Sequence, residues 1–126
     1  MKNILVVDDS RTFRDAIRIL LEKERGLAIC GEAEDGVDAI VKAGELRPDL
    51  ILLDFVMPKL NGAMAASVLK RILPEVPIIL FTSYEASSDA LAPTVSVDVI
   101  VSKADGFRDL LRRVRELLYP QTRHVA

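Results

Sequence analysis

The sequence contains few of the residues on which many catalytic and metal sites depend. It has one cysteine, Cys30, one histidine, His124, and no tryptophan. A single cysteine excludes an internal disulfide and a site built from several thiolates, and the flanking Ile29 and Gly31 are typical of a buried structural cysteine. His124 lies in a polar segment near the C-terminal end, so a Ser/His/Asp or Cys/His triad is not expected. Any chemistry must therefore depend on carboxylates, hydroxyls, lysine and metal.

Strong net charge and long hydrophobic runs are also absent. The 126 residues carry a formal net charge of −2, which gives no basic field, so we expect no direct nucleic-acid binding by this domain. No apolar run approaches the ~20 residues that cross a bilayer, and no signal-peptide pattern is present. We therefore expect a cytoplasmic protein with no membrane association. The length suits one domain, which we place at residues 1–119, followed at 120–126 by a tail or the start of a linker.

Short apolar runs alternate with amphipathic segments along the chain. The runs consist of branched apolar residues and predict strands at 3–7, 27–31, 50–54, 77–81 and 98–102. The segments between them show helical spacing of apolar residues. This alternation predicts an α/β fold with a doubly wound, five-stranded parallel sheet, and we expect the flavodoxin-like strand order 2-1-3-4-5.

The predicted helices differ in the strength of their signals. Ser10 is a suitable N-cap for the first helix, and residues 107–118 form the clearest amphipathic helix of the chain. A helix at about 36–46 places Val37, Ile40 and Val41 on one apolar face. The fourth helix is the weakest, because Pro93 limits a segment at 85–91 to about two turns. We therefore expect an irregular or shortened fourth helix.

Three aspartates mark the ends of two predicted strands. Asp8 and Asp9 close the first run, and Asp54 closes the third. In the expected strand order these two strands are neighbours about 4.8 Å apart, so the three carboxylates converge. Their repulsion is relieved by a hard cation, and Mg²⁺ suits a site of few carboxylates completed by water and phosphate. Calcium would require more protein oxygens than the sequence offers there.

Two further strand ends supply a hydroxyl and an ammonium group. Thr82 follows the fourth run and Lys103 the fifth, and both groups suit the oxygens of a phosphoryl group. Asp54 is the candidate nucleophile, since carboxylates form aspartyl phosphates. Each residue alone has a simpler explanation, because Asp9 and Ser10 are also typical helix caps. Coincidence is nevertheless a poor explanation for five such residues, each at the carboxyl end of a predicted strand.

These residues carry a resemblance to a known family. Asp8-Asp9 after ILVV, Asp54 within LILLDFVMPKLNG, Thr82 after IILF and Lys103 after VIVS make the chain resemble, over nearly its whole length, a receiver domain of the two-component response-regulator family. The resemblance implies that Asp54 accepts a phosphoryl group from a histidine kinase or a small phosphodonor. It also implies Mg²⁺ bound by Asp9, Asp54 and the main-chain carbonyl of Val56, with Asp8 assisting through water, while Thr82 and Lys103 bind the phosphoryl group.

The same resemblance implies a phosphorelay signalling role and not an enzyme, with at most self-phosphorylation and slow self-dephosphorylation. Partners would be a histidine kinase or a histidine phosphotransfer protein, with a possible output domain or target protein, and the domain would be a monomer or a phosphorylation-dependent dimer. Two alternatives stay open: a receiver-like module whose contacts do not depend on phosphorylation, and a Mg²⁺-dependent phosphatase. The phosphatase is disfavoured because Val56 stands where such enzymes require a second acid.

Four positions depart from the family pattern. Ile100 replaces the usual aromatic residue three positions before the lysine, and Ala104 replaces the usual proline after it. Since a non-proline cis bond costs about 3 kcal/mol, we expect a trans peptide or a rearranged loop at Ala104. Pro93 interrupts the fourth helix. Val56 cannot orient an attacking water, so we expect slow loss of the phosphoryl group. The acceptor pocket is therefore expected to be intact, whereas the transmission of the signal to partners is expected to be atypical.

Overall fold

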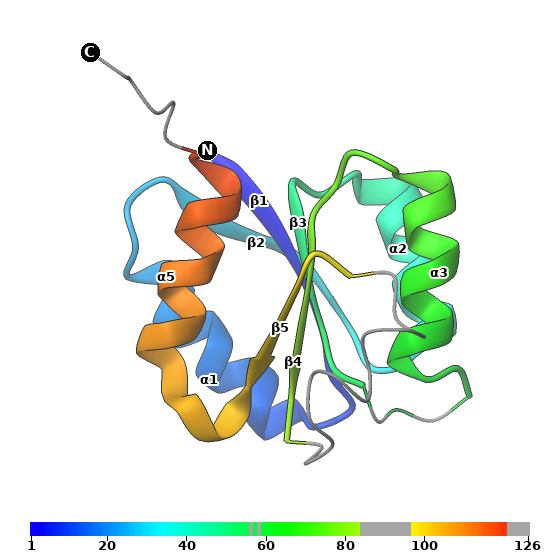
Figure 1. Cartoon of the computed structure of the whole chain (residues 1–126), viewed down its shortest axis with the longest axis horizontal. Coiled ribbons are helices and arrows are strands. Elements are labelled where there is room, and N and C mark those ends of the chain that lie inside the picture. The colour runs from blue at the N-terminus through cyan, green and yellow to red at the C-terminus, as the bar shows by residue number, and fades with distance from the viewer. Residues whose placement is uncertain (56, 58, 84–96, 121–126) are drawn as a thin grey trace.

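The computed structural model describes residues 1–55, 57, 59–83 and 97–120, and a parallel sheet forms the middle layer of this part (Figure 1). Its strands are β1 (Lys2–Val7), β2 (Leu27–Ala33), β3 (Leu50–Leu53), β4 (Ile78–Thr82) and β5 (Val99–Ser102). Each strand is parallel to its neighbours, and the order is β2-β1-β3-β4-β5. The predicted fold class and strand order are confirmed.

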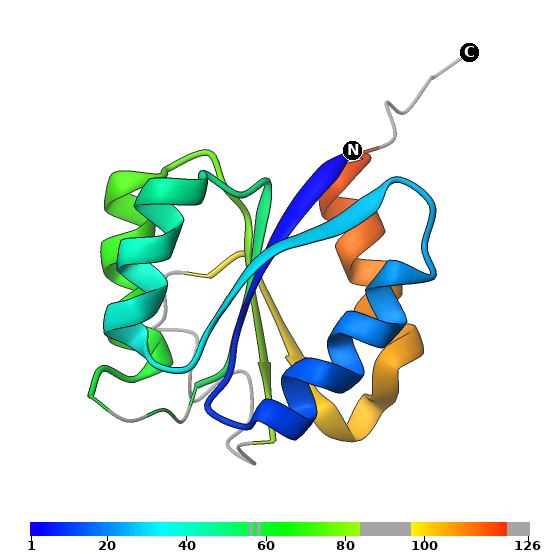
Figure 2. The ribbon, with the colours of Figure 1, turned by 180° about the vertical axis from the view of Figure 1, so that it is seen from behind.

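Helices cover both faces of the sheet. They are α1 (Arg11–Glu22), α2 (Gly36–Leu46), α3 (Gly62–Ile72) and α5 (Gly106–Leu118), the last preceded by a 3₁₀ turn, η2 (Lys103–Asp105). Figures 1 and 2 show α1 and α5 on one face and α2 and α3 on the other. The expected irregular fourth helix and Pro93 lie at 84–96, outside the described residues. No described helix has the length and apolar character needed to cross a membrane.

Three helices begin at side chains that cap them. Ser10, Asp35 and Asn61 each accept a hydrogen bond from the backbone N–H three residues later, at 3.2, 2.8 and 3.0 Å. Such caps satisfy N–H groups that the first helical turn leaves without a partner. Because each cap follows the carboxyl end of a strand, it also fixes the loop that leaves this edge of the sheet. The predicted cap at Ser10 is confirmed.

The two faces of the sheet bury separate hydrophobic clusters, because successive strand residues point to opposite faces. Beneath α1 and α5 the cluster includes Ile4, Val6, Ile17, Leu110 and Val114. Beneath α2 and α3 it includes Leu5, Val7, Leu53, Leu69 and Leu80. Burial on both faces explains why β1, β3 and β4 are apolar without alternation.

The buried face of α2 differs from the one that its larger residues suggest. Val37 and Val41 are 49% and 52% exposed, whereas Ala39 and Ala43 are fully buried. Small side chains let α2 lie close to the sheet and to α3, and larger ones at these positions would hold it away. The apolar face that the spacing of the valines indicates is therefore wrong for two of its three members, and only Ile40 packs partly against the core.

Gly62 permits a close approach between α3 and the loop after β3. A Cβ atom added at Gly62 would lie 2.3 Å from the carbonyl oxygen of Asp54 and 2.7 Å from the Cα of Phe55. We expect Gly62→Ala to lower the free energy of unfolding by about 2 kcal/mol, as for other overpacked sites, measured by urea unfolding. Gly44→Ala is the matched control, because nothing lies within 4 Å of its added Cβ and alanine favours a helix interior. Equal stability of the two variants would contradict the prediction.

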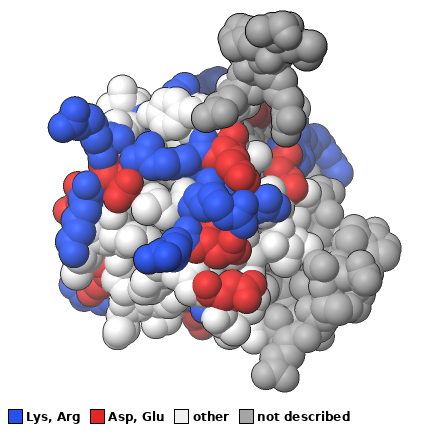
Figure 3. Space-filling model, turned by 60° about the vertical axis from the view of Figure 1, so that its left-hand side comes forward, with Lys and Arg blue, Asp and Glu red and all other residues white. Residues whose placement is uncertain are grey.

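The outer face of α1 and α5 carries charges of both signs. Figure 3 shows basic side chains interspersed with acidic ones on this side of the molecule. On α5, Arg112 bonds to Asp109 at 2.5 Å and to Glu116 at 3.1 Å. Arg115 reaches Glu24 beyond the end of α1 at 2.8 Å. Arg112 and Arg115 are therefore paired with acids, and acidic side chains interrupt the basic ones on this face.

The two ends of the described chain meet at Gly26, in the turn between α1 and β2. The backbone N–H of Lys2 donates to the Gly26 carbonyl at 2.8 Å, and the Tyr119 hydroxyl lies 3.4 Å from the same oxygen. Figures 1 and 2 both show the N-terminus beside the end of α5. This contact lies at the amino ends of the strands, opposite the edge where the aspartates lie.

Candidate functional site

The three aspartates lie together at the carboxyl edge of the sheet. Val7 pairs with Leu53 in the β1–β3 ladder, so Asp8 and Asp54 leave adjacent strands side by side, and the N–H of Asp54 donates to the Val7 carbonyl at 3.0 Å. One carboxylate oxygen from each of Asp8, Asp9 and Asp54 falls within 4.8 Å of the others. Asp8 and Asp54 are 2% and 7% exposed, whereas Asp9 is open to solvent.

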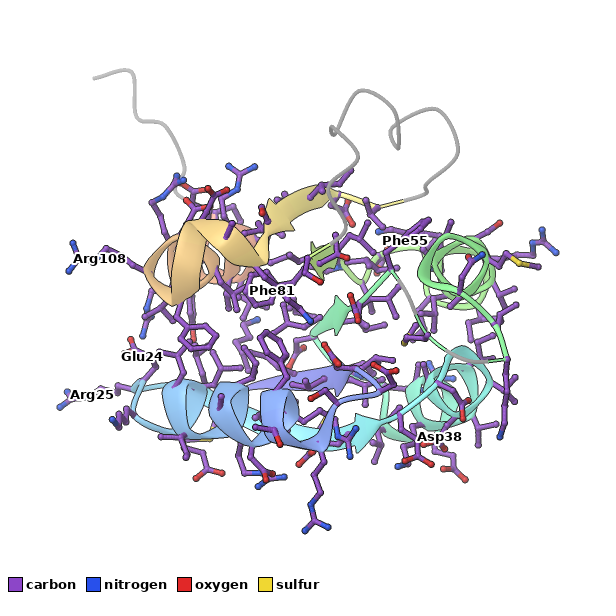
Figure 4. The ribbon with its side chains drawn as sticks, turned by 90° about the horizontal axis from the view of Figure 1, so that it is seen from below. Glu24, Arg25, Asp38, Phe55, Phe81 and Arg108 are labelled. Carbon is purple, nitrogen blue, oxygen red and sulfur yellow. The ribbon has the colours of Figure 1, made fainter. Side chains whose placement is uncertain are left out.

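The two predicted phosphoryl-binding residues lie beside this acidic cluster. Thr82 is the last residue of β4, is 2% exposed, and pairs with Ser102 in the β4–β5 ladder. Lys103 follows Ser102, and its side chain extends back past β4. Its Nζ lies 2.8 Å from Asp8 Oδ2 and 3.8 Å from Asp54 Oδ2. The structure thus brings Asp8, Asp9, Asp54, Thr82 and Lys103 to one edge of the sheet. Figure 4 views the molecule from the side of this edge.

Asp54 occupies an environment that opposes its ionisation. Burial raises the pKa of its carboxyl group above the usual value for aspartate, and the negative charge of Asp8 adds to this effect. The ammonium of Lys103 and hydrogen bonds from the Thr82 side chain and the Phe55 N–H lower the pKa, but by less in total. The Phe55 bond to Asp54 Oδ1 is 2.9 Å long. A cation bound near Asp54 would favour its ionised form and so lower its pKa.

Asp8 is held in a fixed orientation by its neighbours. Its Oδ1 accepts a hydrogen bond from the Ser10 N–H at 2.9 Å, and its carbonyl accepts one from Arg14 Nη1 at 2.5 Å. Arg14 is in turn paired with Glu32 of β2 at 3.0 Å. Sequence reasoning did not identify Arg14. Its place on the first turn of a helix that follows the acid pair is the only signal that could have indicated it.

Phe13 of α1 also borders the site. The Nζ of Lys103 lies 3.8 Å from the centroid of its ring. Nothing in the spacing of the sequence connects the two residues, because they are brought together by the sheet order and by the length of the lysine side chain.

Three carboxylates, with the single ammonium of Lys103 beside two of them, form a donor set suited to a hard divalent cation. Mg²⁺ prefers oxygen ligands and is commonly bound through one or two carboxylates, with water and phosphate completing its shell. Asp8, Asp9 and Asp54 fit this requirement, and the exposure of Asp9 leaves the cluster accessible to solvent. The expected fourth ligand, the carbonyl of Val56, lies outside the described residues.

The departures near Lys103 leave its strand intact. Ile100 pairs with Leu80 in the β4–β5 ladder and packs against the core beneath α2 and α3. No cis peptide bond occurs among the described residues, so the bond before Ala104 is trans, as expected. Ser102 accepts a hydrogen bond from the Ala104 N–H at 3.1 Å, which starts the 3₁₀ turn. This turn occupies the place where the family usually has proline.

Fold and site together define a doubly wound α/β domain with an acidic pocket at the carboxyl edge of its sheet. The family model of the response regulator receiver domain matches residues 4–115. The chain belongs to this family, and it is a receiver domain of two-component systems.

Known relatives agree with this assignment. The response regulator protein VraR of Staphylococcus saprophyticus is 33% identical over 114 residues, which cover 90% of this chain and 54% of that protein. The chain therefore spans about half the length of the curated relatives it matches.

Solved structures with the same fold include the response regulator TrrA of Thermotoga maritima in complex with Mg²⁺ and BeF, with 33% identity and a TM-score of 0.84 over 94% of this chain and 100% of that one. The response regulator domain of CheB from the same organism has 28% identity and a TM-score of 0.81, over 97% and 99% of the two chains.

Proposed function

We propose that Asp54 accepts a phosphoryl group from the phosphohistidine of a histidine kinase or histidine phosphotransfer protein, or from a small phosphodonor, and that the change alters contacts with other proteins. The observation that carries the proposal is the position of Asp54. Its carboxylate is nearly buried beside two further carboxylates, and a lysine ammonium lies 3.8 Å away. This combination suits a nucleophile that must acquire a doubly charged group.

In the proposed reaction a carboxylate oxygen of Asp54 attacks phosphorus while the phosphorus–nitrogen bond of the donor breaks. The imidazole leaves with the electron pair and takes a proton from solvent, and an acyl phosphate remains on Asp54. Catalysis of such a transfer depends mostly on positioning and on neutralising the phosphoryl oxygens. We assign these tasks to the hydroxyl of Thr82 and the ammonium of Lys103, which lie beside the acceptor.

Mg²⁺ is the cofactor that the site residues fit. Asp8, Asp9, Asp54 and the carbonyl of Val56 are its proposed ligands, and TrrA, a relative with the same fold, was solved with Mg²⁺ and BeF. When bound, the ion would offset the charge of the carboxylates and of the phosphoryl oxygens. The protein would then hold no separate catalytic activity beyond its own phosphorylation and a slow dephosphorylation.

Mg²⁺ is expected to stabilise the folded domain. At a concentration ten times its dissociation constant the gain is about 1.4 kcal/mol, measured as a shift of the urea midpoint. Asp9→Asn should remove most of this gain with little cost to the metal-free fold, because Asp9 is exposed. Glu45→Gln on the exposed side of α2 is the control. The assignment fails if Mg²⁺ stabilises the Asp9 variant as strongly as the wild type.

The larger context of the domain is part of the proposal. We infer that residues 1–119 form the receiver domain and that 120–126 are a tail or the start of a linker, with the whole protein in the cytoplasm. This chain matches only about half the length of VraR. We therefore propose that an output domain or a target protein receives the signal. The assembly that we propose is a monomer or a phosphorylation-dependent dimer.

One experiment separates this function from its alternatives. The protein is incubated with acetyl phosphate with and without Mg²⁺, and its intact mass and peptides are analysed. A stable, Mg²⁺-dependent gain of one phosphoryl group on Asp54 supports the proposal. Release of phosphate without accumulation on the protein would support a phosphatase, and the absence of both would support a module whose contacts do not depend on phosphorylation.

A further inference from the structure

Three phenylalanine rings from separate elements meet beside the acidic pocket. Phe13 of α1 lies 5.4 Å from Phe81 of β4 and 6.1 Å from Phe107 of α5, and the last two are 6.5 Å apart, all between ring centroids. We call these residues the phenylalanine trio. Figure 4 shows Phe81 between α1 and α5. The trio borders the pocket on the side away from α2 and α3.

Only one ring of the trio is seen to contact the pocket in the described part of the chain. The Nζ of Lys103 lies over Phe13, 3.8 Å from its centroid. The same nitrogen is 2.8 Å from Asp8 and 3.8 Å from Asp54. A cation over an aromatic face at this distance is attracted by the negative potential of the ring, and the attraction grows as water is excluded. The Lys103 side chain is 18% exposed, so part of its water has been removed.

Phe13 is itself held in place. Its N–H donates to the capping hydroxyl of Ser10 at 3.2 Å, which fixes the first turn of α1. Its ring packs at a tilt of 43° against Phe81, which is 3% exposed and part of the core. A tilted pair of this kind is a favourable aromatic arrangement. The ring therefore offers Lys103 a rigid surface.

We propose that Phe13 is a positioning residue, whose ring holds the ammonium of Lys103 at the entrance to the Asp54 carboxylate. The proposal rests on the proposed function, because Lys103 is taken to bind a phosphoryl oxygen. A ring attracts the ammonium without neutralising it. Lys103 can therefore exchange a carboxylate oxygen for a phosphoryl oxygen while one of its contacts stays unchanged. An aliphatic residue at position 13 would fill the space without this attraction.

The test uses the full chain with mono-, di- and trifluorinated phenylalanine placed at position 13 alone. Fluorine withdraws the negative potential of the ring with little change of shape. The rate of Asp54 phosphorylation by acetyl phosphate with Mg²⁺ should fall stepwise, by about fivefold across the series. The rate of the Phe13→Leu variant should fall at least as far. The same series at Phe107 is the matched control, since that ring belongs to the trio and Lys103 lies over Phe13.

The outcomes distinguish the two proposals. A flat series at position 13 in a protein that is phosphorylated overturns the role of Phe13 and leaves the proposed function standing. Absence of phosphorylation in the wild type overturns both.

Urea unfolding of Phe13→Leu, Lys103→Met and the double variant, without Mg²⁺, tests the contact independently of phosphorylation. The two changes should be non-additive by about threefold in the unfolding equilibrium constant, and additivity would overturn the proposal. Should Lys103→Met fail to fold, the contact is tested by NMR, where the ring should shift the Lys103 Cε protons upfield in the wild type and not in Phe13→Leu.

Discussion

Replacement of Asp54 by asparagine is expected to abolish phosphorylation by acetyl phosphate. The amide has the size and shape of the carboxyl group, so the loop and its neighbours are retained, but it lacks the charge that makes the oxygen a nucleophile. The measurement is the intact mass after incubation with Mg²⁺. Asp38→Asn on α2 is the control, because Asp38 is an aspartate of a surface ion pair with Lys42 and should leave labelling unchanged. Label that persists at position 54 in the asparagine variant would refute the assignment.

The same variant should be more stable than the wild type when Mg²⁺ is absent. Burial and the charge of Asp8 raise the pKa of Asp54 in the folded protein, so its ionised form is disfavoured by folding. Stability from this group is therefore gained as the pH falls through its folded pKa and lost as the pH rises through it. Asparagine has no such penalty. We therefore expect the asparagine variant to have a higher free energy of unfolding than the wild type at neutral pH.

The pH dependence of this difference provides the sharper measurement. As the pH falls toward the ordinary pKa of aspartate, Asp54 takes up its proton earlier in the folded protein than in the unfolded chain, because folding raises its pKa. The advantage of the asparagine variant should therefore shrink on acidification. Urea unfolding of both proteins at neutral and acidic pH tests this, and contributions from acids remote from the pocket cancel in the comparison. A difference that grows on acidification would show that the pKa of Asp54 is lowered by folding, contrary to the structural assignment.

Lys103→Met is the second change with a large expected effect. Methionine keeps much of the apolar stem that lies over Phe13 but removes the charge that faces Asp8 and Asp54. The loss of one preplaced cation at a developing charge typically costs about 100-fold in rate. We expect a drop of that size in phosphorylation by acetyl phosphate, measured with saturating Mg²⁺ so that the two carboxylates are not left unpaired.

Lys23→Met is the matched control for this loss of charge. Lys23 is exposed at the C-terminal end of α1, and the opposite end of the helix borders the pocket. The phosphorylation rate of the Lys23→Met variant should therefore equal that of the wild type. A Lys103 variant that is phosphorylated as fast as the Lys23 variant would exclude Lys103 from the site. A variant that loses Mg²⁺ stabilisation together with its rate would instead indicate that Lys103 acts by arranging the metal ligands.

The fold could be predicted because its signals are local. Runs buried on both faces have to be apolar throughout, and each ends abruptly at a polar residue, so both the strands and their carboxyl ends are visible in the sequence. The aspartates and Thr82 are carried by the backbone at those ends, and strand order alone brings them together. Their convergence at one edge of the sheet could therefore be predicted once the parallel strand order was assumed.

Contacts made by long side chains could not be predicted in the same way. Strand spacing indicates that the stem of Lys103 can partly span the distance to the acids, but it does not indicate that a ring from α1 lies beside the ammonium. Arg14 reaches a backbone carbonyl, which any residue possesses. The buried face of α2 was missed for another reason, because spacing favours the larger valines whereas close packing selects Ala39 and Ala43.

The shared contact of Lys2 and Tyr119 with Gly26 has a practical consequence. Both ends leave the domain at the amino ends of the strands, and the length of β1, six residues or about 20 Å, separates them from Asp54. A reporter protein fused at either end should therefore leave the pocket open to a phosphodonor. A short peptide joining the ends would permit circular permutation, with new termini opened in the surface turn at Pro74 and Glu75, and the permuted domain should retain its acidic pocket.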